Sequence, residues 1–254
     1  MIRQVQTLAE LKSIRSGLHG SVGFVPTMGA LHRGHIELFK KARAENDHVI
    51  VSVFVNPTQF DNKKDLEKYP SNLEQDLKLA REARIDYFWT PTYPQLYPDQ
   101  YSYRITENQL SKKFCGAHRP GHFDGVLTVV MKLLNLSKPQ RAYFGEKDFQ
   151  QLTLIKGMVE AYFLDVEIIP VPTIREENGL ALSSRNQRLS DVEKKKAHLI
   201  YKAISTASTA EEAHNLLTAE GFQVDYIEDF GKRRLAAAYL GSTRLIDNVE
   251  LKTK

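Results

Sequence analysis

The sequence has a single cysteine, Cys115, among its 254 residues. One cysteine forms no disulfide within the chain and excludes a zinc site made of several thiolates. Long apolar runs are lacking too: VIVSVFV at 49–55 is the longest, whereas a membrane-spanning helix needs about 20 residues. The first residues, MIRQVQTLAELKS, lack the apolar segment of a secretion signal. We therefore expect a soluble, cytoplasmic protein without a membrane partner.

A strong excess of one charge is also lacking. Charged residues make up 26% of the chain, and the formal net charge is +4. Lysines and arginines are interspersed with acids, which is typical of a solvated surface and not of a nucleic-acid-binding face. The sequence thus predicts no nucleic-acid partner, while a phosphate-rich substrate remains compatible with it.

Apolar strand-like runs alternate with amphipathic helical runs along the first two thirds of the chain. HVIVSVFVN at 48–56 is continuously apolar and fits a strand buried on both faces, in the middle of a parallel sheet. This alternation predicts an open α/β sheet with right-handed crossovers. The other strands expected are 23–26, 86–91, 141–145 and 166–172, and the helices are 34–46, 71–85, 125–137 and 148–163.

Polar segments follow three of the expected strands. They are TMGALHRGH at 27–35, NPTQF at 56–60 and GEKDFQQ at 145–151. Because the carboxyl ends of parallel strands meet at one edge, and ligands bind there near a switch in strand order, we expect the three segments to line one crevice.

The composition of the sequence changes after Pro172. TIREENGLALSSRNQRLS is turn-rich and polar, so we expect a domain boundary near Thr173, with domains at 1–173 and 174–254. The second domain should contain helices at 191–206 and 210–220 and short strands at 222–228, 235–240 and 243–249.

The segment HRGH places two imidazoles, His32 and His35, at the start of an expected helix. Imidazole donors, the free N–H groups of the first turn and the helix dipole suit a phosphate that gains charge. Gly29 permits a tight turn, and Gly34 lets a nucleotide approach the backbone. Alternatively, the histidines cap the helix or lie on the surface. The pair is a poor zinc site, because no third ligand is near and HExxH does not occur.

Other candidate residues carry weaker signals. Lys147 could neutralise phosphate oxygens, and Asp148 could contact the ligand or simply cap the next helix. SSRN at 183–186 could cover a phosphate. His118 and His122 cannot share a helical face across Pro120 and Gly121, so Arg119 is the better candidate in that loop. Asn56 and Gln59 could bind a small polar substrate. Asp76 could help to hold Mg²⁺, although its spacing alone favours an ordinary solvated helix face.

Taken together, PTMGALHRGH, VFVNPTQF, LEKYP, RPGHFDGVLTVV, YFGEKDFQQL, VPTIREENGLALSSRN and LGSTRLIDN resemble the pantothenate synthetase (pantoate–beta-alanine ligase) family, in order and over nearly the whole chain. HRGH also resembles the HIGH-type signature of the wider nucleotidyltransferase superfamily. The resemblance implies a Rossmann-like amino-terminal domain, a small α+β carboxyl-terminal lid domain and a homodimer.

The activity that this resemblance implies is a two-step ligation that uses ATP and Mg²⁺. The pantoate carboxylate attacks the α-phosphate of ATP to give pantoyl adenylate and pyrophosphate, and beta-alanine then displaces AMP to give pantothenate. Pantoate, beta-alanine and ATP are thus the expected partners. Alternatives are another HxGH nucleotidyltransferase with a phosphorylated acceptor, and a nucleotide-binding regulatory protein without turnover.

The resemblance also implies roles for the candidate residues. His32 and His35 would stabilise charge at the α-phosphate, the second of them as proton donor, and Lys147 would neutralise the phosphates. Gln59 and Gln151 would hold pantoate, with Asn56 and Arg119 as further substrate-binding candidates. The implied ATP site comprises Met28, Gly29, Ala30, Leu31, His32, Arg33, Gly34, His35, Gly145, Glu146, Lys147, Asp148, Ile174, Leu182, Ser183, Ser184 and Arg185.

Two departures from the family pattern stand out. Cys115 occupies a position where a glutamate is usual, in a loop that helps to form the site wall and the dimer contact in the family. The connection between DYIED and GKRRL is short, which predicts a trimmed lid domain. We expect the residues needed for chemistry to lie before this connection.

Overall fold

The computed structural model describes residues 2–251 of the chain. Residues 3–171 are built on a six-stranded sheet in the order β1-β4-β3-β2-β5-β6, in which every neighbouring pair is parallel. The predicted open α/β sheet is therefore confirmed, with β3 in its interior. The strands are β1 (Arg3–Val5), β2 (Val22–Thr27), β3 (His48–Val53), β4 (Tyr87–Trp89), β5 (Arg141–Gly145) and β6 (Glu167–Val171).

The strand order reverses at β2. The chain passes from β2 to β3 on one side, and β5 pairs with β2 on the other. The connections that leave the carboxyl ends of β2 and β5 therefore diverge and open a crevice between them, which is where ligands bind in such sheets.

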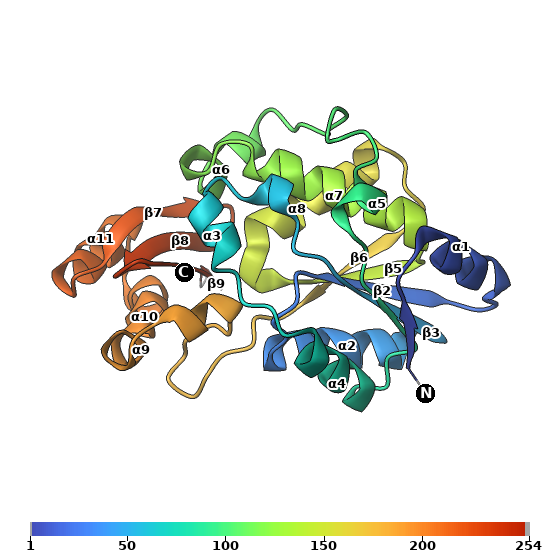
Figure 1. Ribbon diagram of the computed structural model, residues 1–254. Coiled ribbons are helices and arrows are strands. Elements are labelled where there is room, and N and C mark those ends of the chain that lie inside the picture. The colour runs from blue at the N-terminus through green and yellow to red at the C-terminus, as the bar shows by residue number, and fades with distance from the viewer. Residues whose placement is uncertain (1, 252–254) are drawn as a thin grey trace.

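Helices cover both faces of this sheet (Figure 1). Successive side chains of a strand point to opposite faces, so Val49 and Val51 pack in one core cluster and Ile50 in another. The buried apolar side chains of α2 and α4 belong to the first cluster, and those of α1, α7 and α8 belong to the second. These helices are α1 (Leu8–Gly17), α2 (Arg33–Glu45), α4 (Leu73–Glu82), α7 (His122–Ser137) and α8 (Phe149–Ala161).

The amino-terminal β1 and α1 were not predicted. Their local signal is TLAE, in which the Thr7 hydroxyl accepts a hydrogen bond from the backbone N–H of Glu10, and the Glu10 carboxylate accepts one from the N–H of Thr7. This capping box marks a helix start independently of apolar periodicity.

The carboxyl-terminal region forms a three-stranded antiparallel sheet with helices against it (Figure 1). Ala236 and Ala238 pack in the core with these helices, whereas Ala237 packs in the cluster of the first domain. The sheet is thus buried on both faces, and its small side chains let both layers approach. Its elements are α9 (Asp191–Ala197), α10 (Leu199–Thr206), α11 (Ala210–Ala219), β7 (Gln223–Phe230), β8 (Arg233–Leu240) and β9 (Thr243–Glu250).

Two expectations for this region need correction. The helix expected at 191–206 is divided at His198 into α9 and α10. The short connection after DYIED is a tight hairpin turn at Gly231 and Lys232, with Gly231 at a φ of +58°. A two-residue turn favours glycine at positive φ, so the short connection coexists with a complete sheet.

Short elements complete the fold. They are α3 (Lys63–Glu67), α5 (Tyr93–Leu96) and α6 (Cys115–His118), with 3₁₀ turns η1 (Pro57–Gln59), η2 (Leu110–Lys112), η3 (Glu146–Asp148) and η4 (Ser184–Arg188). Among the described residues, no helix is both long and apolar enough to cross a membrane.

Candidate active site

The three polar segments predicted to meet do so at the carboxyl ends of β2, β3 and β5. A cavity at the strand switch, here called the switch-point cavity, lies between them and the SSRN turn. An adjoining interdomain cavity shares part of its lining and extends toward β9. The predicted site residues around the switch-point cavity are Met28, His32, Gly34, His35, Asn56, Gln59, Gly145, Lys147, Asp148, Gln151, Ile174, Leu182, Ser183, Ser184 and Arg185.

The two histidines both cap the helix and face the switch-point cavity. The backbone N–H of Gly34 donates to Nδ1 of His32 (3.1 Å), and the N–H of His32 donates to Nδ1 of His35 (3.2 Å). Each Nδ1 is therefore an acceptor, which leaves Nε2–H as the remaining donor of each neutral ring. Helix capping and a functional role are compatible here, because each ring uses Nδ1 for the cap and keeps Nε2–H for a ligand.

Both imidazoles are neutral near pH 7. Burial is the first cause that lowers the pKa of His32, to about 4, and the Lys147 ammonium lowers it further. The pKa of His35 lies well below its ordinary value because of burial, and then because of His32 and Lys147. The pair thus offers Nε2–H donors without a permanent positive charge.

His122 is neutral for a related reason. Burial and the Arg119 guanidinium lower its pKa to about 3. We expect the free energy of unfolding to be constant above about pH 6.5 and to decrease as the pH falls toward 4, since the unfolded chain then binds protons that the folded histidines do not. Urea unfolding at pH 7.5 and 5.0 measures this, and a His122→Asn variant should show a smaller decrease. Equal stability at both values would contradict the assignment.

The turn before HRGH is held by Asp76. Its carboxylate accepts hydrogen bonds from the backbone N–H groups of Ala30 (3.0 Å) and Leu31 (2.7 Å), and Asp76 is only 2% exposed. The alternative of a solvated helix face is wrong. Because both carboxylate oxygens hold this turn, and Asp76 lines neither cavity, we propose no magnesium role for it.

Gly29 of the same turn has a φ of +79°, and a Cβ there would lie 2.9 Å from Oδ2 of Asp76. We expect Gly29→Ala to lower the free energy of unfolding by about 1–3 kcal/mol, through backbone strain and displacement of that carboxylate. Urea unfolding measures the change. Gly17→Ala is the matched control, since a Cβ at Gly17 meets nothing within 4 Å. Equal stability of the two variants would contradict the tight turn.

GEKD at the end of β5 brings Lys147 to both cavities. Its ammonium lies 3.6 Å from a carboxylate oxygen of Asp148, and its side chain is 17% exposed. Asp148 occupies the N-cap position of α8 but makes no side-chain capping bond. Helix capping therefore does not explain Asp148, whose half-exposed carboxylate faces the cavity.

Gln59 and Gln151 line both cavities. The Gln59 amide donates to Sδ of Met28 (3.1 Å) and accepts from Nδ2 of Asn56 (3.0 Å). Asn56 is 1% exposed; its amide also donates to the Gly125 carbonyl, and its oxygen accepts from the hydroxyls of Thr58 and Tyr97. Within the described chain, Asn56 therefore orients Gln59 through its own amide.

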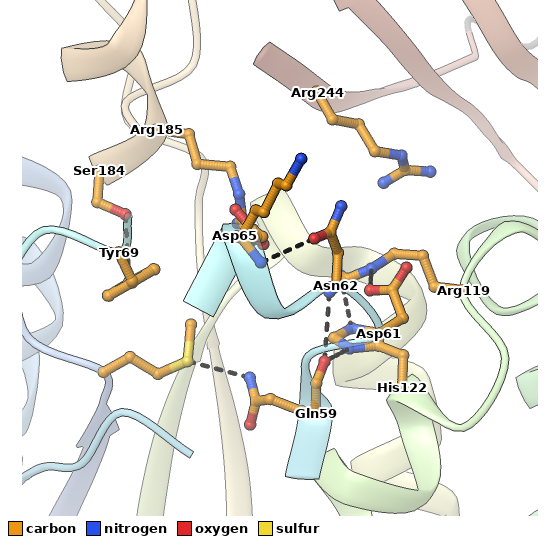
Figure 2. Close-up of polar contacts among 12 residues, drawn as sticks. Gln59, Asp61, Asn62, Asp65, Tyr69, Arg119, His122, Ser184, Arg185 and Arg244 are labelled. Carbon is orange, nitrogen blue, oxygen red and sulfur yellow. Dashed lines mark hydrogen bonds and ion pairs between the residues drawn. The ribbon is translucent and has the colours of Figure 1, made fainter. Parts of the chain in front are cut away.

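Arg119 also forms hydrogen bonds with neighbouring residues of the chain (Figure 2). It donates to Oδ1 of Asp61 (2.8 Å) and to the carbonyl of Gln59 (3.2 Å), to which Nδ1 of His122 also donates (2.7 Å). Arg119 lines the interdomain cavity and not the switch-point cavity. Arg119 and His122 of the HRPGH segment thus hold the backbone carbonyl of Gln59 in place.

The SSRN turn and the following Arg188 contact the segment from Asp65 to Tyr69 (Figure 2). The hydroxyls of Ser184 and Tyr69 lie 3.2 Å apart, and Arg185 donates to the Asp65 carboxylate at 3.0 Å. Arg188 also pairs with Asp65. These contacts hold the turn at the switch-point cavity, which Ser183, Ser184 and Arg185 line.

Several predicted residues lie behind the cavity walls. Gly29, Ala30, Leu31, Arg33 and Glu146 line neither cavity. Arg33 instead donates to the carbonyl of Arg175 (2.9 Å).

Two residues of the LIDN motif were missed. Asn248 and Asp247 contact the segments that carry Lys147 and SSRN. The expectation that the residues needed for chemistry precede the short connection stays a prediction, and these two residues contact the segments that carry them. The signal was LIDN itself, in which an acid and an amide directly follow two apolar residues of the strand.

Cys115 is buried, and its Sγ lies 3.0 Å from the Tyr226 hydroxyl and 3.5 Å from Nη1 of Arg244. It borders the interdomain cavity, and its contacts join α6 to the carboxyl-terminal sheet of the same chain. The thiol is thus part of a domain contact.

A parallel sheet with a switch-point cavity, helix-start imidazoles and a nearby lysine and arginine defines a class: an α/β protein that binds a phosphorylated ligand. The model of the pantoate-beta-alanine ligase family matches residues 1–250. A pantothenate synthetase of Bdellovibrio bacteriovorus is 58% identical over 99% of this chain and 100% of its own length. One of Coxiella burnetii is 50% identical over 98% and 97%.

Among solved structures, a pantoate-beta-alanine ligase of Francisella tularensis, complexed with beta-gamma ATP and beta-alanine, superposes with a TM-score of 0.94. It is 43% identical and covers 98% of each chain. The chain belongs to the pantoate-beta-alanine ligase family, and it is an enzyme that forms pantothenate.

Proposed function

We propose that the switch-point cavity binds ATP and pantoate and forms a pantoyl adenylate, which beta-alanine converts to pantothenate and AMP. The observation that supports this most strongly is the arrangement of His32, His35 and Lys147 around one cavity that also contains Gln59 and Gln151. Phosphate-binding and amide groups thereby share one space, as attack of a carboxylate on a phosphate requires. The Francisella ligase with its bound beta-gamma ATP and beta-alanine supports the same pair of substrates.

The proposed chemistry needs positioning and charge stabilisation. The Nε2–H groups of His32 and His35 donate to the α-phosphate as negative charge develops, and Lys147 neutralises the phosphates. Arg185 and the Ser183–Ser184 hydroxyls cover them, and closure excludes water from the acyl adenylate. Gln59 and Gln151 orient pantoate, with Asn56 and Arg119 fixing Gln59.

Magnesium is proposed as part of the ATP substrate. Among the described residues, no group of three or more acidic, histidine or cysteine side chains is arranged to hold a metal. This fits Mg²⁺, which is commonly held by one or two carboxylates together with substrate phosphates and water. Asp148, the carboxylate beside Lys147, would face the ion. The ion would add to the neutralisation of phosphate charge.

We further propose a domain boundary at Thr173, with residues 1–173 as the nucleotide- and pantoate-binding domain and 174–254 as the lid. The change from the parallel to the antiparallel sheet supports it. Residues 1 and 252–254 of these ranges lie outside the described part. The homodimer stays a prediction from the resemblance, and the cytoplasmic location stays a prediction from the sequence composition.

Isotope exchange tests the proposed reaction directly. The protein is incubated with ATP, Mg²⁺, pantoate and labelled pyrophosphate, and label should enter ATP only when pantoate is present. Addition of beta-alanine should then release AMP. Exchange that needs a phosphorylated acceptor would favour another nucleotidyltransferase, and ATP binding without turnover would favour a regulatory protein. Either outcome would overturn the adenylate proposal.

A further inference from the structure

Two neighbouring residues of β9, Asp247 and Asn248, lie between the segments that carry the phosphate-binding side chains. Each is only 3% exposed. Successive residues of a strand point to opposite sides, so the two side chains reach different segments. Asn248 contacts GEKD, and Asp247 contacts Arg175 in the segment that leads to SSRN.

Asn248 holds the backbone of GEKD at two points. Its Nδ2 donates to the carbonyl oxygens of Glu146 (2.9 Å) and Lys147 (3.0 Å). Both protons of the amide are thus directed at adjacent peptide groups. Because one of them belongs to Lys147 itself, the amide restricts the point from which the lysine side chain extends.

Arg233 of β8 fixes the orientation of this amide. Its Nη1 donates to Oδ1 of Asn248 (2.7 Å), and its Nη2 donates to the Glu146 carboxylate (3.0 Å). The guanidinium also lies 4.6 Å from the ring centroid of Phe149, the first residue of α8. The contacts of Arg233 and Asn248 therefore extend along the whole turn that carries Lys147.

Asp247 connects the same strand to the other side of the site. Its carboxylate accepts two hydrogen bonds from Arg175 (2.6 and 2.9 Å), a bidentate geometry that adds directional restraint. The Arg175 carbonyl in turn accepts from Arg33, in the first turn of the HRGH helix. One strand of the carboxyl-terminal sheet thus links the lysine turn to the histidine helix.

We propose that Asn248 is a positioning residue for Lys147, which fixes the ammonium group for the transition state of adenylate formation. The proposal rests on the role of Lys147 in the proposed function. The carboxyl-terminal domain accordingly contributes to the chemical step through its sheet, besides covering the substrates. A purely structural role would instead change stability, with turnover of the folded protein unaltered.

A double-mutant cycle tests this role. We expect Asn248→Ala to lower kcat of pantoate-dependent pyrophosphate exchange by about 10- to 100-fold. This is the cost of displacing the Lys147 ammonium by about 1 Å. The KM for ATP should change by less than about threefold, because the loss falls on the transition state. In a Lys147→Ala background, Asn248→Ala should have little further effect. The proposal would be overturned if Asn248→Ala lowered kcat by the same factor in the wild type and in Lys147→Ala, or if it left kcat of the wild type unchanged.

Asn248→Asp is the second variant. It keeps the size of the side chain and the acceptor for Arg233 but lacks both donors, so its kcat should fall as for Asn248→Ala. Asn215→Ala, on the exposed surface of α11, is the matched control and should leave kcat unchanged. Wild-type kcat in Asn248→Asp would contradict the proposal.

Chemical labelling without substrates provides a readout independent of turnover. Trace acetic anhydride with mass spectrometry compares the acetylation rate of Lys147 with that of Lys156, which is exposed on α8. We expect Asn248→Ala to change the rate at Lys147 at least about twofold and to leave Lys156 unaffected. Unaltered labelling of Lys147 would contradict its placement by Asn248. If the wild type showed no pyrophosphate exchange, the proposed function would be rejected. The acetylation of Lys147 would still test its placement by Asn248, because it needs no substrate.

Discussion

Replacement of Lys147 by alanine should lower pantoate-dependent turnover by about a hundredfold or more, the usual cost of losing a charge-stabilising donor. The Lys147 side chain is 17% exposed and lies between both cavities, where its ammonium can meet the phosphates while the surroundings exclude most water. A charge interaction is stronger in such a site than at the surface. Pyrophosphate exchange and steady-state AMP release measure the loss.

The control for this variant is Lys156→Ala, on the exposed side of α8, the helix that follows the turn of Lys147. It removes a lysine side chain that lines neither cavity, so turnover should remain that of the wild type. Turnover of Lys147→Ala within a fewfold of this control would reject the assigned role. Lys147→Arg should also be impaired, because a guanidinium differs from an ammonium in size and donor geometry.

Replacement of His35 by alanine should also lower turnover by about a hundredfold or more. The reason is specific to the geometry of the cap: Nδ1 accepts the backbone N–H of His32, so Nε2–H is the group left to donate to a phosphate. Because the neutral ring adds little charge to the ground state, we expect the KM for ATP to change less than kcat does.

His35→Asn separates the cap from the chemistry. The asparagine oxygen can accept the His32 N–H in place of Nδ1, but the side chain is too short to supply the Nε2–H donor. Turnover should therefore remain as low as in His35→Ala while stability recovers. His214→Ala, an exposed histidine of α11, is the control. Wild-type turnover in His35→Asn would contradict the donor role.

Much of the fold could be predicted because its signals are local. The apolar run of β3 and the helical period of α4 depend only on near neighbours, and the parallel sheet follows from their alternation. Elements with few apolar residues were missed or misjudged for the same reason. The short α3 has no buried residue, and β1 contains only three residues.

The candidate site was predicted less completely than the fold. Motif chemistry indicated His35, Lys147 and Gln59, all of which line the cavity. It could not indicate how Arg119 is used, since the Asp61 partner lies 58 positions away in the sequence. An isolated guanidinium is a candidate for any anion, and only the fold shows that a carboxylate of the chain already occupies it.

The sequence by itself determined that this is an α/β protein with polar segments at the ends of its strands, because burial and period are properties of consecutive residues. The tertiary structure alone decided that the Asp76 carboxylate lies beneath the turn of Ala30 and Leu31, and that Asn248 reaches Lys147 across 101 positions. Such contacts join groups that no local pattern relates, since their closeness depends on how the sheets and helices pack.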